Sequence, residues 1–176
     1  NALSGSLPPA LGSNMSQMRW VQLQQNKLTG QLPTAFGEMV EVSRLLVHQN
    51  ALSGSLPTQL GQLSALRLLA LNDNAIGGAI PTQIGRLDGL HVLDLYNNQL
   101  TGDPPASLSQ LVNLKQLYLD NEQLTPLRVW YCRQRMPAVG KYNYRILREE
   151  WHRISQAYCE DPYTTTEAFG SLDEIE

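Results

Sequence analysis

The sequence predicts an α/β repeat fold, a solenoid in which short parallel strands stack from one coil to the next. Three observations predict it. Asparagines recur at positions 1, 26, 50, 74, 98 and 121, with spacings of 25, 24, 24, 24 and 23 residues. A phrase containing Leu or Ile, Gly and Pro follows each of the first five, and leucines precede the later ones at fixed spacing. Such a period is typical of stacked units that bury one continuous core.

The repeated phrase reads Asn-x-Leu-x-Gly-x-Leu-Pro, as in residues 50–57, and the run Leu66-x-x-Leu69-x-Leu71 stands before Asn74. These residues match the leucine-rich repeat pattern LxxLxLxxN. The continuation NxLxGxLP resembles the plant-specific class of that family, which includes receptor-kinase ectodomains and polygalacturonase-inhibiting proteins. The resemblance covers residues 1–125 and implies a leucine-rich-repeat solenoid with short parallel strands on its concave face.

Alternation along each strand predicts which side chains face the core. Leu69 and Leu71 are expected to point inward, whereas Arg67, Ala70 and Asn72 are expected to lie outside. Each repeated Asn is expected to bond backbone groups of the adjacent coil that would otherwise be buried unpaired. The Gly of each phrase suits tight backbone, and the Pro that follows ends hydrogen bonding on that flank. We interpret all these residues as scaffold.

The period is broken at both ends of the array. One extra residue lies near Ser13 and Asn14, and one is lost before Asn121. A shortened last coil is what we expect where an array meets a cap. The chain also begins in the middle of a repeat with no polar cap before Asn1, so we expect a longer protein whose N-terminal cap is missing here.

The sequence after the array predicts two further regions. Residues 126–159 are expected to form a helical C-terminal cap, because Pro126 suits a first helical turn and later apolar residues are spaced three and four apart. Residues 160–176 contain six acids and no base and are expected to form an acidic tail. Cys132 and Cys159 could form one disulfide across the cap or remain buried thiols.

Composition excludes several classes of function. The net charge of −3 and the 16% of charged residues indicate neither a disordered chain nor a nucleic-acid binder. No apolar run approaches the roughly 18 residues of a membrane span. His48 and His91 have no cysteine or carboxylate at ligand spacing. Cys132 and His152 could be a nucleophile and its base, but both fall on the expected cap helices and nothing supplies an oxyanion hole. We therefore expect no metal site, no cofactor and no enzyme active site.

The concave strand face is the predicted binding surface, because its side chains have no packing role inside their own coil. Apolar and aromatic residues form a strip there, flanked by Arg and Asp, which is typical of protein interfaces. Cross-strand packing is the alternative explanation of this strip. The predicted partner-binding residues are Arg19, Trp20, Arg44, Leu46, His48, Arg67, Leu68, Asn72, Val92, Asp94, Tyr96, Gln116 and Tyr118.

The sequence therefore predicts a non-catalytic module for protein–protein interaction. One interpretation is an intracellular scaffold or assembly subunit within a larger complex, which the sparse cysteines favour. The alternative is an extracellular recognition domain, either a receptor ectodomain or an inhibitor of a secreted hydrolase. The plant-type repeat favours this alternative, as does Asn14-Met15-Ser16, which is a glycosylation acceptor if the protein is secreted.

Overall fold

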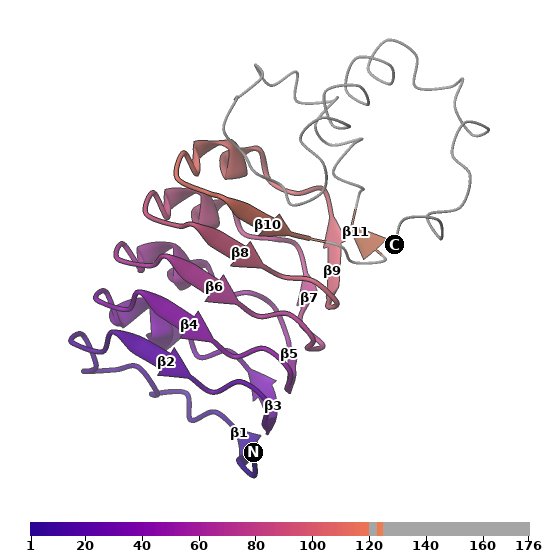
Figure 1. The fold of residues 1–176 in the computed structure, drawn as a ribbon. Coiled ribbons are helices and arrows are strands. Elements are labelled where there is room, and N and C mark those ends of the chain that lie inside the picture. Colours follow the sequence, from indigo (N-terminus) through magenta and orange to yellow (C-terminus); the bar gives the residue numbers. More distant parts are fainter. Residues whose placement is uncertain (120–122, 125–176) are drawn as a thin grey trace, which may run out of the picture.

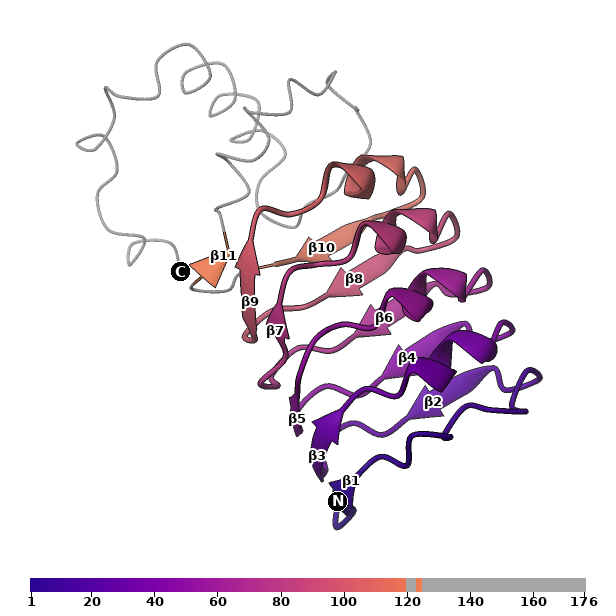
Figure 2. The same cartoon turned by 180° about the vertical axis from the view of Figure 1, so that it is seen from behind.

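The structure is a computed structural model that describes residues 1–119 and 123–124. These residues form a solenoid whose coils stack one above another, with the even-numbered strands from β2 to β10 along one side and a second row of odd-numbered strands along another (Figures 1 and 2). The predicted repeat fold is thereby confirmed. The helical cap, the acidic tail, Cys132 and Cys159 lie outside the described residues.

One parallel sheet contains a three-residue strand from each of five successive coils, in the order β10-β8-β6-β4-β2. Its register joins residues that are one repeat apart, so Val21 lies beside Leu45, and Leu45 beside Leu69. Every strand therefore presents its middle residue to the same side. The strands are β2 (Trp20–Gln22), β4 (Arg44–Leu46), β6 (Leu68–Ala70), β8 (Val92–Asp94) and β10 (Gln116–Tyr118).

A second row of short strands follows each repeated Asn, where the sequence predicts only tight backbone. They pair in parallel from coil to coil, and the glycine of the phrase takes a positive φ, 76° at Gly30 for example, which glycine adopts without steric cost. The strands are β1 (Ser4–Ser6), β3 (Lys27–Gln31), β5 (Ala51–Ser53), β7 (Gly77–Gly78), β9 (Gln99–Gly102) and β11 (Gln123–Leu124).

A 3-10 helix completes each of four coils directly after the proline of the phrase. Proline fixes φ near −65° and lacks an N–H, so it suits the position before the first turn. Pro57, for instance, has φ −69° and caps the second of these helices. The helices are η1 (Thr34–Glu38), η2 (Thr58–Gln62), η3 (Thr82–Arg86) and η4 (Ala106–Gln110).

The repeated asparagines form the expected ladder between coils. The Asn74 side-chain amide donates to the backbone oxygens of Val47, at 3.1 Å, and Leu71, at 3.0 Å. Its Oδ1 accepts a hydrogen bond from the backbone N–H of Leu52 at 3.0 Å. Val47 and Leu52 belong to the preceding coil, so one side chain satisfies backbone groups of two coils. Asn50 and Asn98 make equivalent bonds, which confirms the scaffold role of this column.

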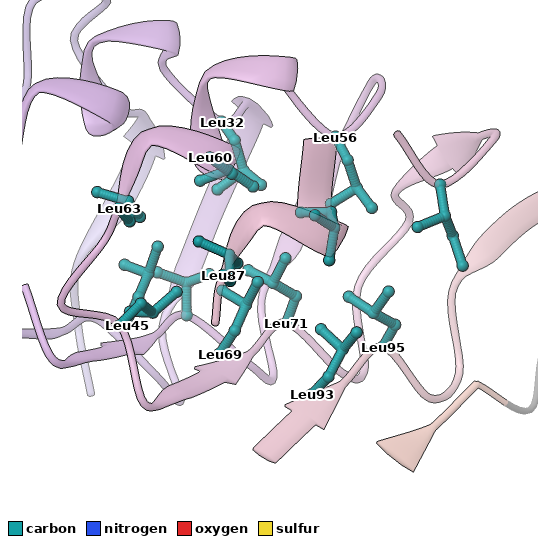
Figure 3. Close-up of a cluster of buried hydrophobic side chains, with 14 of the residues drawn as sticks. Leu32, Leu45, Leu56, Leu60, Leu63, Leu69, Leu71, Leu87, Leu93 and Leu95 are labelled. Atoms are coloured by element: carbon teal, nitrogen blue, oxygen red, sulfur yellow. The ribbon is translucent and has the colours of Figure 1, made fainter. Parts of the chain in front are cut away.

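Leucines from all sides of the solenoid fill one continuous core, with Leu45, Leu69 and Leu93 stacked along the sheet (Figure 3). Each of these three side chains is fully buried. Burial of each such apolar side chain is worth about 1.5–3 kcal/mol, and the column is one of several that make up the core. Apolar burial therefore runs through the stack instead of being confined to single coils.

Glycines let the 3-10 helices approach closely. A Cβ on Gly37 would lie 2.6 Å from the backbone oxygen of Gln59, and one on Gly61 would collide with the backbone oxygen of Gln83. Ser109 occupies the equivalent position in the last of these helices. The first coil differs, since turns replace its 3-10 helix and Asn14 takes φ 61° where the extra residue was noted.

Candidate protein-binding face

The outward side chains of the five-stranded sheet form two straight columns. The register aligns Trp20 with Arg44, Arg44 with Leu68, and Leu68 with Val92. Two residues further along the strands, the second column is Gln22, Leu46, Ala70, Asp94 and Tyr118. We call this surface, with the residues directly before and after the strands, the sheet face.

The predicted binding residues gather on this one face, and they differ in exposure. Trp20 and Tyr96 are the most exposed large apolar side chains among them, at 60% and 47%. Arg19, Arg44 and Arg67 are exposed as well. The remaining predicted residues are half-buried: Leu46, His48, Leu68, Asn72, Val92, Asp94, Gln116 and Tyr118.

Backbone hydrogen bonds between successive coils also align the residues that follow the strand ends. The N–H of Gln49 donates to the oxygen of Asn72 at 3.0 Å, and the N–H of Asp73 donates to the oxygen of Tyr96 at 3.0 Å. His48 is joined to the coil below by a bond of the same length to the N–H of Gln25. His48, Asn72 and Tyr96 therefore continue the sheet face past the ends of the strands.

A cation–π contact positions a side chain at the N-terminal end of the sheet face. The guanidinium carbon of Arg44 lies 5.5 Å from the centroid of the Trp20 ring. Such contacts are worth about 0.5–1 kcal/mol at an exposed site. Trp20 is thus held in place by its neighbour while one of its surfaces stays available to a partner.

A polar cluster occupies the strand ends, and its centre is a residue that the predicted site omits. The Asp73 carboxylate accepts hydrogen bonds from the Asn72 amide at 2.7 Å and the Asn97 amide at 2.8 Å. Both Asp73 oxygens are used, so the carboxylate is fixed between two coils. The only sequence signal for this cluster was a run of Asn and Asp directly before the repeated asparagines.

Asp94 lies beside this cluster in an unfavourable setting for a negative charge. Burial raises the pKa of its carboxyl group, and the nearby Asp73 charge raises it further, whereas a hydrogen bond from the Tyr96 N–H at 3.1 Å and the nearby His48 lower it. A cationic group of a partner placed here would relieve the repulsion between the two carboxylates.

Two buried polar atoms of the same region have no hydrogen-bond partner within the part of the chain that the structure describes. They are Gln24 Oε1 and His48 Nδ1, one coil apart along the strand-end column. Buried polar atoms are almost always paired in proteins. This stretch of the face therefore retains unused hydrogen-bonding capacity.

Ala70 corrects one expectation from the sequence. It faces outward as expected, yet it is only 7% exposed. Its neighbours in the column are Leu46 and Asp94, whose larger side chains flank the alanine methyl on both sides. Side-chain size in adjacent coils, not strand alternation, decides its burial.

The described residues contain no group of three or more His, Cys, Asp or Glu side chains that could hold a metal ion. Within the same part of the chain, no helix has the length and apolar character needed to cross a bilayer. Asn14, the candidate glycosylation residue, is exposed on the first coil.

A family model described as Leucine rich repeat matches residues 64–124. Solved structures match more of the chain. PEPR1–AtPEP1 is 36% identical with a TM-score of 0.66, and the match covers 70% of this chain and 18% of that one. The Arabidopsis receptor kinase HAESA ectodomain, in complex with an N-terminally extended IDA peptide hormone, is 31% identical with a TM-score of 0.65, covering 71% and 20%.

A plant ice-binding protein is also similar, at 29% identity and a TM-score of 0.65, covering 69% of this chain and 39% of that one. No curated protein matches the chain in sequence. The chain thus spans only 18% of the PEPR1 chain and 20% of the HAESA chain. The similarity concerns the repeat array and not the whole length of those proteins.

Proposed function

The chain is a leucine-rich repeat protein of the plant type, and on this premise we propose that it is a non-catalytic module that binds a protein partner on its sheet face. The observation that carries the proposal is the apolar strip on that face. Trp20, Leu68 and Val92 lie in one column with exposed or half-buried side chains, and Tyr96 is exposed beyond the strands. Large aromatic and arginine side chains of this kind are the usual centres of binding energy.

Comparisons with known proteins support a binding role. The HAESA structure contains a peptide hormone bound to a repeat ectodomain of the same architecture. The sheet face also carries charges of both signs, with Arg44 at the start of its strand and Asp73 and Asp94 near the ends of theirs. It could therefore pair with both acidic and basic groups of a partner. In this role the protein acts as a scaffold or assembly subunit.

Site-directed photo-cross-linking tests the proposal. A photoreactive amino acid at Tyr96 is expected to capture a distinct partner, whereas the same amino acid at the exposed Ala51 of the second row is not. The double variant Leu68→Glu, Tyr96→Ala should then lower affinity for the identified partner by more than about tenfold. Equal cross-linking at Tyr96 and Ala51, or unchanged affinity of a correctly folded double variant, contradicts the proposal.

A second candidate is an extracellular recognition domain, favoured by the receptor ectodomain among the similar structures and by the exposed Asn14. The intact mass of protein from its native source tests it. A glycan on Asn14, with Cys132 and Cys159 alkylated only after reduction, is the expected result for a secreted protein. An unmodified Asn14 with two free thiols supports the intracellular scaffold.

A further inference from the structure

One edge of the sheet face presents a regular row of cations. Hydrogen bonds from each backbone N–H to the residue one coil below join Ser43 to Arg19 at 2.8 Å, Arg67 to Ser43 at 2.9 Å, His91 to Arg67 at 2.8 Å and Lys115 to His91 at 2.8 Å. A cation therefore recurs on alternate coils, with Ser43 and His91 between. We call Arg19, Arg67 and Lys115 the cation row.

Nothing in the described part of the chain neutralises this row. Arg19, Arg67 and Lys115 are exposed, and their side chains make no hydrogen bond or ion pair with any described residue. Glu41, in the loop before β4, is an acid close in sequence, and no ion pair joins it to the row. Because like charges repel, the described part of the chain gains no stability from the cation row. An anionic partner would remove this repulsion by binding to the row.

The spacing of the row limits the shape of that partner. Adjacent strands of a sheet lie about 4.8 Å apart, so cations on alternate coils are separated by about 9.6 Å. A polyproline II segment rises about 3.1 Å per residue and has three residues per turn, so every third side chain recurs on one face after about 9.3 Å. In a β-strand, residues three apart point to opposite faces, and only one of them could reach the row.

Neighbouring residues favour a protein segment over a nucleic acid. Trp20, Leu68 and Val92 run parallel to the cation row, one residue further along the chain, and offer apolar contacts for side chains between the acids. Asp94 ends β8 and Asp73 follows the end of β6, so both lie on the side of the sheet face away from the cation row, where a polyanion that covered the whole face would be repelled. The molecule as a whole carries a net charge of −3.

We propose that the cation row binds an extended, polyproline-II-like segment of a partner protein that carries an acidic residue at every third position. The segment lies across the strands and parallel to the stacking direction, with successive carboxylates on Arg19, Arg67 and Lys115. This inference rests on the proposed function and names the chemistry of the partner that the sheet face recognises.

Fluorescence anisotropy with the full chain and two labelled synthetic peptides tests the inference. Both peptides have about 12 residues of Asp, Pro and Ala. One carries Asp at every third position, and the other carries the same number of Asp in a single block. The periodic peptide is expected to bind about tenfold more tightly, and added salt should weaken it because the contacts are exposed ion pairs.

Charge-reversal variants locate the site. Arg67→Glu should lower affinity for the periodic peptide by about tenfold. Arg86→Glu is the matched control, because Arg86 is an exposed cation in the last turn of η3, away from the sheet face. Circular dichroism melting curves of both variants should match that of the parent protein.

Several results would overturn the inference. These are equal binding of the two peptides, equal losses in the two variants, or competition by a single-stranded oligothymidylate as strong as that of the unlabelled periodic peptide. If neither peptide binds while cross-linking at Tyr96 still captures a partner, the inference of an acidic segment is wrong and the proposed function stands. If that cross-linking also fails, the proposed function fails with it.

Discussion

The inner and outer columns of the five-stranded sheet lie one residue apart on the same strands. They differ in how much the side chain changes from one coil to the next. The inner column hardly changes along the stack: Val21, Leu45, Leu69, Leu93 and Leu117. The outer column changes at every step: Trp20, Arg44, Leu68, Val92 and Gln116. Both columns have the same backbone and the same hydrogen-bond register, so the backbone does not explain the difference.

Packing explains it. An inner side chain fills a space whose size is set by identical neighbours above and below, so only a similar side chain fits. An outer side chain faces solvent and is free to vary. The repeated columns therefore hold the molecule together, and the varied columns form the surface on which we propose that a partner binds. Four comparisons between variants test this division, from the largest expected effect to the smallest.

Removing one rung of the asparagine ladder should be the most damaging. Asn74→Ala leaves the backbone N–H of Leu52 without its partner. It also removes one of the two side-chain amides that donate to the Val47 oxygen and to the Leu71 oxygen, which Asn50 and Asn98 still reach. An unpaired buried group costs about 1–3 kcal/mol and a lost hydrogen bond about 0.5–1.5 kcal/mol, so we expect a loss of about 4 kcal/mol in the free energy of unfolding. Urea denaturation measures it. Asn113→Ala, which removes one exposed bond to the Asp88 oxygen, is the control and should cost less than about 1 kcal/mol.

Adjacent leucines on β6 give the most direct comparison of inside and outside. Leu69 is fully buried, so Leu69→Ala should cost about 3 kcal/mol, whereas Leu68→Ala on the sheet face should cost about 1 kcal/mol or less. Denaturation curves measure both losses. Equal losses would show that the sheet face is packed like the core and is not a free surface.

The close approach of the 3-10 helices should tolerate no added methyl group. Gly61→Ala places a Cβ against the backbone oxygen of Gln83, and overpacking of this kind costs about 1–3 kcal/mol. Gly77→Ala is the matched control, because the nearest atom to its Cβ is 3.5 Å away. A lower melting temperature for Gly61→Ala alone is the expected result, and equal melting temperatures would contradict it.

The smallest effect concerns the charge of Asp94. Because its pKa is raised in the folded protein, the folded state holds the proton to higher pH than the unfolded chain, and stability falls as pH rises through the folded pKa. Asp94→Asn keeps an acceptor for the Tyr96 N–H and removes the charge. It should raise stability at pH 7 by less than about 0.5 kcal/mol, since solvent screens a half-exposed group.

The gain from Asp94→Asn should disappear in acid, below the ordinary carboxyl pKa, where both states of the parent protein are protonated. Melting curves at the two pH values measure the difference. An equal gain at both would assign the effect to packing and not to charge.

The repeat architecture could be predicted from sequence because its cause is local. The spacing of Leu69 and Leu71 determines which side chains face inward, and the structure confirms both as fully buried. The period of 24 residues also places each Asn beside the coil before it, where Asn50 and Asn74 make the predicted bonds. The alignment of the sheet-face residues in columns follows from the same period.

Other features could not be predicted from the repeat. The second row of strands pairs from coil to coil, whereas the motif indicates only tight backbone at Gly30 and its equivalents, which take a positive φ. The 3-10 helices have no apolar periodicity long enough to recognise. The extra residue near Asn14 was visible in the sequence, whereas its effect, a coil without a 3-10 helix, was not.

The sequence by itself determined the solenoid, its core and the identity of the sheet-face columns, because a strict period repeats the same local geometry in every coil. Only the tertiary structure decided which of those face residues are accessible. Ala70 is covered between Leu46 and Asp94, and Asp73 is fixed by the amides of Asn72 and Asn97. The physical reason is that accessibility depends on side-chain sizes and hydrogen bonds one coil away, which no single repeat specifies.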